Sequence, residues 1–405
     1  EAVAGKGDRD APFTVHGFPD PGQRNRAWAM VDVNGDGRSD VIAADTRSNA
    51  LAVFLQSPDG DLVASESSPS LSNIDSIAAV PASDGHPAEL LVLSSEEGIV
   101  GRTPLGPGEL PFPTPVPVTA GLEPVAMNVV TLGGRPHAAV IANNKRDYAL
   151  DLLDLRSGES ESIELGSLSR KPDHVQSVDV DQDGREDILI LTPERPMILL
   201  LADEDGGFEK LEKRDMGQYG LVDGAQSDTT ATLDVNSDGT EELLVASGNF
   251  VRALRFERGD GGGWRVVRQF NADDPDSSLV SVATLNGTLI AADADNDRIL
   301  IFEPSEDGER WTQSESLRTR GFTPGPLATG NFSGDIPGII TIGEDGFAIV
   351  PLGGQRRTLQ EASSWKSALD GHVPHRLAVG DVNADGYGDM VALDAGEQMF
   401  EIFTF

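Results

Sequence analysis

The sequence contains no cysteine among its 405 residues. It therefore has no disulfide framework, no thiolate zinc site and no thiol nucleophile. Any cross-link that stabilises the fold must use other groups, and carboxylates that bind a metal are the obvious candidates. A run of about 18 consecutive apolar residues is also lacking, so the sequence predicts no membrane insertion.

Positive charge is scarce as well. The chain has 31 Lys and Arg against 67 Asp and Glu, and its formal charge at pH 7 is −36. A surface this negative repels phosphate backbones and anionic lipid heads, because binding either one needs Lys and Arg to displace counterions. The composition therefore predicts that nucleic acid is not a partner.

Glycine and proline, in contrast, are abundant and spread through the chain, with 45 Gly and 25 Pro. They punctuate helices too often for a long helical bundle, so the composition favours an all-β fold. The length alone suggests two or three domains, but all-β rings often exceed the usual domain size. The internal repeats of the chain therefore decide the domain organisation.

Four segments share the nine-residue pattern Asp-x-Asp/Asn-x-Asp-Gly-x-x-Asp/Glu, and we count its positions from 1 to 9. They are acidic loop 1 (32–40), acidic loop 4 (179–187), acidic loop 5 (234–242) and acidic loop 8 (381–389), numbered by the repeat unit that contains them. A short apolar run follows each loop at once. These runs have the length and residue types of β-strands.

The loop spacing reveals eight repeat units. Successive acidic loops start 147, 55 and 147 residues apart, and 147 is three units of 49. Weaker copies of the unit lie in the gaps, near residues 76–93, 126–142, 280–290 and 327–342. Acidic loops 1 and 5 are 202 residues apart, as are acidic loops 4 and 8, which indicates a pseudo-twofold ring.

Each unit reads as four short strands, and four strands per unit repeated around a ring predict a β-propeller. We expect a single all-β domain over 1–405 with eight four-stranded blades; seven blades is the alternative if the short unit near 280–290 is miscounted. The last unit ends after its third strand, so residues 11–20 are predicted to add the missing strand and close the ring. The expected blades are 24–72, 73–121, 122–170, 171–224, 225–277, 278–325, 326–375, and 376–405 with 11–20.

The acidic loops have the chemistry of calcium sites. Ca²⁺ takes six to eight oxygen ligands, and in such a loop positions 1, 3, 5 and 9 offer side chains while position 7 offers its carbonyl. Glycine at position 6 permits the sharp turn. About four Ca²⁺ sites are predicted, with the ligands Asp32, Asn34, Asp36, Arg38 (carbonyl) and Asp40; Asp179, Asp181, Asp183, Arg185 (carbonyl) and Asp187; Asp234, Asn236, Asp238, Thr240 (carbonyl) and Glu242; and Asp381, Asn383, Asp385, Tyr387 (carbonyl) and Asp389.

Other interpretations of the loops are weaker. Asp-Gly hairpins with incidental surface acids would not keep the whole nine-residue pattern in four copies, and clustered like charges need a counter-cation. EF-hand and dockerin loops continue directly into a helix, and the EF-hand has Glu at position 12. Here position 12 is Ala43, Ile190, Val245 or Ala392, each inside an apparent strand.

Two further segments resemble the loops only in part. Blade 7 keeps Asn331, Ser333 and Asp335 but has isoleucine where the last ligand belongs, so we expect an empty or weak site. The segment Asp293–Asp297 resembles a fifth site, although it aligns with the next hairpin turn of its unit.

On these motifs the chain resembles the FG-GAP/VCBS repeat family, whose calcium-loop propellers also occur in integrin α subunits. The resemblance covers the chain through its repeat and is strong in blades 1, 4, 5 and 8. It implies calcium in the loop between the first two strands of a blade, with a mainly structural role. Blades 2, 3, 6 and 7 depart from the family pattern because ligands are missing.

A catalytic motif is not visible in the sequence: a Gly-x-Ser-x-Gly elbow, a phosphate loop and His-Glu-x-x-His are all lacking. The pair His372 and His375 is separated by Pro374, which prevents a helical metal-binding face.

We therefore expect a non-catalytic, calcium-stabilised interaction scaffold that binds a protein or glycan partner through propeller-face loops. The alternative is a polysaccharide lyase, which needs a Tyr, His or Lys base and cationic groups over the central funnel. Loops of this kind suit millimolar calcium, so the expected location is extracellular, periplasmic or at the cell surface.

Overall fold

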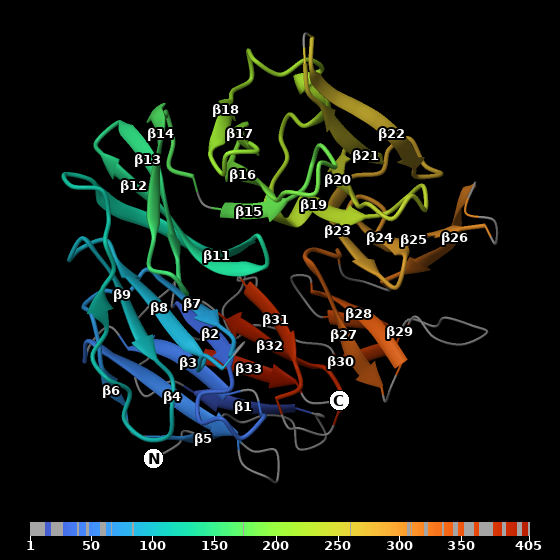
Figure 1. Ribbon diagram of the computed structural model, residues 1–405. Helices are drawn as coiled ribbons and strands as arrows, with labels where there is room; N and C mark the ends of the chain where they lie inside the picture. Colours follow the sequence, from blue (N-terminus) through green and yellow to red (C-terminus); the bar gives the residue numbers. More distant parts are fainter. Residues whose placement is uncertain are drawn as a thin grey trace.

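A computed structural model of the chain gives the arrangement of the strands. It describes residues 13–17, 27–38, 40–45, 48–56, 62–65, 67–82, 85–172, 174–259, 261–305, 308, 310–319, 323–333, 336–342, 347–351, 360–363, 376–382, 386–394 and 399–403. The described strands form eight antiparallel sheets, which we number 1 to 8 in chain order. Figure 1 shows these sheets following one another around the molecule, with the first (blue) beside the last (red).

The first four sheets use consecutive strands. Sheet 1 contains β2 (Trp28–Val31), β3 (Asp40–Asp45), β4 (Ala50–Gln56), β5 (Leu62–Ala64) and the short β6 (Ser68–Pro69), which pairs with β4. Sheet 2 contains β7 (Ser76–Val80), β8 (Glu89–Ser94), β9 (Ile99–Pro104) and the edge strand β10 (Thr114–Pro115). Sheet 3 contains β11 (Glu123–Leu132), β12 (Arg135–Asn144), β13 (Asp147–Asp154) and β14 (Ser160–Ser167). Sheet 4 contains β15 (His174–Val178), β16 (Asp187–Thr192), β17 (Arg195–Ala202) and β18 (Phe208–Leu211).

The remaining sheets repeat this order. Two short 3₁₀ helices, η1 (Tyr219–Leu221) and η2 (Ser227–Thr229), precede sheet 5. Sheet 5 contains β19 (Thr230–Leu233), β20 (Glu242–Ser247), β21 (Phe250–Glu257) and β22 (Gly263–Asn271), and sheet 6 contains β23 (Leu279–Leu285), β24 (Thr288–Asp293), β25 (Arg298–Pro304) and β26 (Trp311–Arg318). Sheet 7 contains β27 (Leu327–Ser333), β28 (Ile336–Ile342), β29 (Phe347–Pro351) and β30 (Gln360–Ser363). Sheet 8 contains β31 (Arg376–Gly380), β32 (Asp389–Asp394) and β33 (Met399–Phe403).

The fourth strand of sheet 8 comes from the other end of the chain. Strand β1 (Phe13–Gly17) pairs antiparallel with β33, with Phe13 opposite Phe403 and Gly17 opposite Met399. Residues nearly 390 positions apart in the chain therefore share one sheet, which is the pairing that the missing fourth strand of the last unit predicts.

The core consists of layers between neighbouring sheets. In β20, for example, Leu243 and Val245 pack in a cluster with sheet 4, whereas Leu244 and Ala246 pack in a cluster with sheet 6. Alternate side chains of a strand point to opposite faces, so a second strand with neighbours on both faces is apolar throughout. This is why these strands appear in the sequence as continuous apolar runs rather than as an alternation.

The same kind of layer joins sheets 1 and 2, 2 and 3, 3 and 4, and 6 and 7. A further cluster contains Val41 and Ala43 of sheet 1 together with Val391 of sheet 8. The first and last sheets are therefore packed against each other, in agreement with their adjacent positions in Figure 1. None of the described helices is long and apolar enough to cross a membrane.

Candidate metal centre

Each acidic loop joins the first strand of its sheet to the second. Acidic loop 1 lies between β2 and β3, acidic loop 4 between β15 and β16, acidic loop 5 between β19 and β20, and acidic loop 8 between β31 and β32. Position 9 of every loop is the first residue of the second strand. These residues are Asp40, Asp187, Glu242 and Asp389, and at most 1% of each is exposed. Four carboxyl groups are thus buried at equivalent places.

A shared set of hydrogen bonds shapes the loops. The backbone N–H of position 2 donates to the position 9 carboxylate in all four loops, over 2.8, 3.0, 3.0 and 2.6 Å in chain order. The N–H of the glycine at position 6 donates to the position 1 carboxylate, over 2.8 Å in acidic loop 1 and 2.9 Å in the others. These bonds draw positions 1 and 9 toward the same turn.

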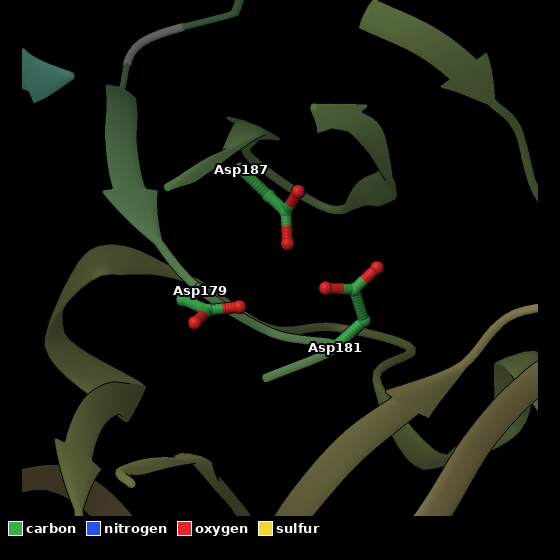
Figure 2. A group of neighbouring side chains, drawn as sticks. All are labelled: Asp179, Asp181 and Asp187. Atoms are coloured by element: carbon green, nitrogen blue, oxygen red, sulfur yellow. The ribbon is translucent and has the colours of Figure 1, made fainter. Parts of the chain in front are cut away.

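In acidic loop 4 three carboxylates converge. One oxygen from each of Asp179, Asp181 and Asp187 lies within 4.8 Å of the others. Figure 2 shows the three carboxyl groups facing a common space. Asp183, the predicted ligand at position 5, is not part of this group. Its carboxylate pairs with the guanidinium groups of Arg185 and Arg258.

Acidic loops 1 and 5 are more open. In both, the asparagine at position 3 accepts a hydrogen bond from the N–H of position 5, over 3.0 Å for Asn34 and 2.9 Å for Asn236. Its amide also donates to the carboxylate of Asp36 or Asp238. Within the described residues, neither loop brings three carboxylates as close together as acidic loop 4 does.

Several residues singled out in the sequence lie outside the described residues. In acidic loop 8 this applies to Asn383 and Asp385, although Asp381 and Asp389 follow the common hydrogen-bond pattern. Asp335 and the pair His372 and His375 also lie outside them.

Burial dominates the electrostatics of acidic loop 4. It raises the pKa of Asp187 to about 7; the charges of Asp181 and Asp179 add to the increase, and the backbone N–H groups of Ala202 and Val180 oppose it. Burial likewise raises the pKa of Asp179. A buried carboxyl group with a raised pKa is one whose charge is poorly compensated by its surroundings.

The position 9 acids of acidic loops 1 and 5 also have raised pKa values. Burial raises the pKa of Asp40 and of Glu242, and the charges at positions 1 and 5 of their own loops contribute in the same direction. Glu242 also accepts a hydrogen bond of 3.2 Å from Gln182 of acidic loop 4, so the two neighbouring loops are in direct contact.

The donor set of acidic loop 4 fits a hard divalent cation. All its side-chain donors are carboxylate oxygens, which Ca²⁺ prefers over nitrogen or sulfur. Three of them already face one another, and one belongs to an acid with no exposed surface. A bound cation would compensate the charge that burial leaves uncompensated.

Sheets 3 and 6 have tight turns where the acidic loops occur elsewhere. Gly133 and Gly134 join β11 to β12, and Asn286 and Gly287 join β23 to β24. All four residues have positive φ, between 49° and 73°. This is the backbone of a two-residue hairpin, which is too short to surround a cation. These two units, which lack the metal-ligand pattern, thus have a turn too short for a metal site.

In sheet 2 arginine side chains neutralise the corresponding acid, which the sequence analysis missed. Glu89 is the first residue of β8 and so occupies the place of position 9. Arg102 donates to both of its carboxylate oxygens, over 2.9 and 2.6 Å, and Arg156 lies 3.3 Å from one of them. The apolar run that directly follows Glu89 could have revealed the equivalence with Asp40.

The segment 293–297 has a different structure from the acidic loops. Asp293 ends β24, so the segment forms the connection between the second and third strands of sheet 6. Arg298 donates to Asp293 over 2.8 Å, and Asn296 donates to the same oxygen over 3.0 Å. Protein donors therefore satisfy the acid that a fifth metal site would need.

Comparison with known proteins supports the repeat. The model of a family described as FG-GAP-like repeat matches residues 179–245, which contain acidic loops 4 and 5. No curated protein matches the chain. Among solved structures, a functionally unknown protein from Desulfotomaculum acetoxidans DSM 771 is similar with a TM-score of 0.45 and 11% identity, over 80% of this chain and 98% of that one. The Dos1 propeller also has a TM-score of 0.45 and 11% identity, over 93% of this chain and 88% of that one. The resemblance to FG-GAP repeats is thus confirmed for residues 179–245.

Proposed function

We propose that this protein is a calcium-stabilised, non-catalytic interaction scaffold that works outside the cytoplasm. In this proposal residues 1–405 form one eight-bladed β-propeller closed by its N-terminal strand, with the blade limits predicted from the repeat. Ca²⁺ binds about four acidic loops through the predicted ligands. A protein or glycan partner binds the loops on one face of the ring.

The convergence of Asp179, Asp181 and Asp187 carries the calcium part of the proposal. The same pattern of position 1 and position 9 hydrogen bonds in the other three acidic loops supports extending it to them. When bound, the cation would hold the two ends of each loop together and compensate the buried acid. Its role would therefore be mechanical, since it would stiffen the connection between two strands of a blade.

Two observations support a closed ring. Strand β1 completes sheet 8, and the cluster of Val41, Ala43 and Val391 joins sheet 8 to sheet 1. A closed ring gives every blade a neighbour on both faces, which matters for a chain that has no disulfide to hold its ends together.

The tyrosines support a non-catalytic role over a lyase. Tyr148 and Tyr219 are buried in core clusters, and the Tyr219 hydroxyl accepts a hydrogen bond from the N–H of Met197. Burial raises the pKa of Tyr219 to about 12, which is the opposite of what a general base needs. Tyr387, the third, lies within acidic loop 8.

Calcium removal tests the proposal. Thermal unfolding in excess EDTA should occur several degrees lower than in millimolar Ca²⁺, because a ligand that binds only the native state stabilises it. Elemental analysis should find about four calcium ions per chain, and Mg²⁺ at the same concentration should restore less stability. A melting temperature that EDTA does not change, with no bound metal, would contradict the calcium role. A glycan panel probed in both buffers would test the partner.

A further inference from the structure

Arg258 belongs to sheet 5 but contacts acidic loop 4 of sheet 4. It follows β21 directly, and its guanidinium donates to the carboxylate of Asp181 and to the carbonyl of Ala202. The same guanidinium lies 3.1 Å from an oxygen of Asp183 and 3.9 Å from an oxygen of Asp187. One arginine therefore contacts three of the four carboxylates that the loop would use to bind a cation.

Two of these three carboxylates are shielded from solvent, which strengthens the contact. The Asp181 side chain is 3% exposed and that of Asp187 is fully buried. A charge interaction at a given distance is stronger in such surroundings than at an open surface, because the effective dielectric constant is lower. A guanidinium and a divalent cation both need the oxygen lone pairs of Asp181 and Asp183, and their charges repel each other. The guanidinium and the divalent cation therefore cannot both bind the cluster with full affinity.

The segment that carries Arg258 has room to move it. Gly259, Gly261 and Gly262 follow in the β21–β22 connection, and the first two have φ of 110° and 78°. Arg258 also lines two hollows of about 430 and 340 Å³. Its side chain is 34% exposed, so the guanidinium can leave the cluster without first being pulled from the core.

The pseudo-twofold counterpart of Arg258 lacks the charge. An offset of 202 residues places Gln56 at the equivalent position of sheet 1, where it ends β4. The pair of acidic loops 8 and 1 thus has a neutral amide where the pair of acidic loops 4 and 5 has a cation.

We propose that Arg258 is an internal competitor that lowers the calcium affinity of acidic loop 4. This inference rests on the proposed calcium function and adds a regulation to it. Acidic loop 4 then fills at higher calcium than the loop at the opposite side of the ring, and its filling displaces the Arg258 side chain from the carboxylates. The arginine is the counter-ion of the loop whenever calcium is scarce.

Calcium titration of Arg258→Gln tests the proposal. In chelator-treated protein, calorimetry should show one class of sites whose Kd becomes about ten-fold smaller, the equivalent of one charge-assisted hydrogen bond. The melting temperature should fall in EDTA but not in saturating calcium. Adding Asp187→Asn to Arg258→Gln should remove the tightened class and so assign it to acidic loop 4. The matched control is Arg265→Gln, on the same hairpin, where Arg265 pairs with Glu257 over 2.9 Å.

The outcomes separate the two proposals. If the wild-type protein binds no calcium, the proposed function fails. If wild type binds calcium but Arg258→Gln leaves every Kd unchanged, the competitor role is wrong and the calcium function stands. An equal loss of melting temperature in EDTA and in calcium would show that Arg258 is a structural ion pair only. Arg258→Lys, which keeps the charge but loses the planar fork, should bind calcium with an affinity between those of the other two proteins.

Discussion

At the scale of single residues, the acidic loops depend on a backbone conformation that favours glycine. The glycine at position 6 has φ of 84°, 87°, 89° and 90° in the four loops, in chain order. A Cβ atom in this left-handed region crowds the residue's own backbone. For Gly184 an added Cβ would meet no other atom within 4 Å, so conformation alone demands the glycine.

Replacing Gly184 with alanine should therefore destabilise the protein by about 1–2 kcal/mol. Urea unfolding at constant calcium measures the loss. Asparagine tolerates the same φ better, so Gly184→Asn should cost less than Gly184→Ala. Gly220→Ala is the control, because Gly220 also has free space for a Cβ and lacks the positive φ. Equal costs at the two glycines would show that the turn conformation is not the cause.

At the scale of elements, six of the eight sheets have a buried acid at one end of the second strand, and they compensate its charge in different ways. The second strand begins with a buried acid in sheets 1, 2, 4, 5 and 8. In sheet 2 arginines neutralise that acid, whereas the four acidic loops carry the calcium pattern. Sheet 6 shortens the connection and places its own buried acid, Asp293, at the other end of the second strand, against Arg298.

The pairing of Asp293 with Arg298 links β24 to β25 and predicts a pH dependence. Burial opposes the shift, but hydrogen bonds from Arg298 and Ser277 outweigh it and lower the pKa of Asp293. A folded-state pKa below the unfolded value of about 3.9 gives stability that is present above that pH and lost as the pH falls further. Asp293→Asn should thus cost about 2 kcal/mol at pH 7 and progressively less below about pH 4.

Denaturant unfolding of both proteins between neutral and acid pH measures this difference, and titration of the shared acidic loops cancels in the comparison. The control is Asp273→Asn, because Asp273 also pairs with Arg298 but its side chain is 59% exposed. An exposed pair contributes little, so this variant should cost less than about 1 kcal/mol. A cost of Asp293→Asn that stays constant down to pH 3 would contradict the assignment.

At the scale of the whole molecule, stability depends on contacts between consecutive sheets and on one contact between the chain ends. Each layer of the core combines residues of two sheets, so a single sheet buries neither face by itself. The cluster that joins sheets 8 and 1 continues this series across the ends of the chain. Strand β1 adds backbone pairing within sheet 8, along β33.

Deleting residues 1–17 should therefore destabilise the protein by a few kcal/mol, since five paired positions of β33 lose their partners. The exposed edge of β33 should also promote self-association. Thermal unfolding and analytical ultracentrifugation measure the two effects. Deletion of residues 1–12 leaves β1 in place and is the matched control. Equal melting temperatures for both deletions would show that β1 does not stabilise sheet 8.

Most of the local structure was predictable from the sequence. The four apolar runs after the acidic loops are the strands β3, β16, β20 and β32, because a strand buried on both faces cannot contain polar interruptions. The interval of about 49 residues and the unpaired segment near Phe13 predicted which strands share a sheet. The equivalence of Glu89 with position 9 was not predicted, because its unit lacks the rest of the loop pattern, although Glu89 begins an equivalent strand.

By itself, the sequence determined the strands, the order of the repeats and the positions of the acidic loops, because all of these depend on residue periods and neighbours along the chain. Local pairs such as Arg185 with Asp183 are visible along the chain, but the fold alone sets which groups of neighbouring sheets contact the acids. It brings Arg258 to Asp181 across 77 residues, Arg156 to Glu89 across 67 and Gln182 to Glu242 across 60. Such contacts arise when neighbouring sheets pack, and a local pattern of residues carries no record of them. The acidic loops and their local ion pairs are thus properties of the sequence, whereas the contacts from neighbouring sheets are properties of the fold.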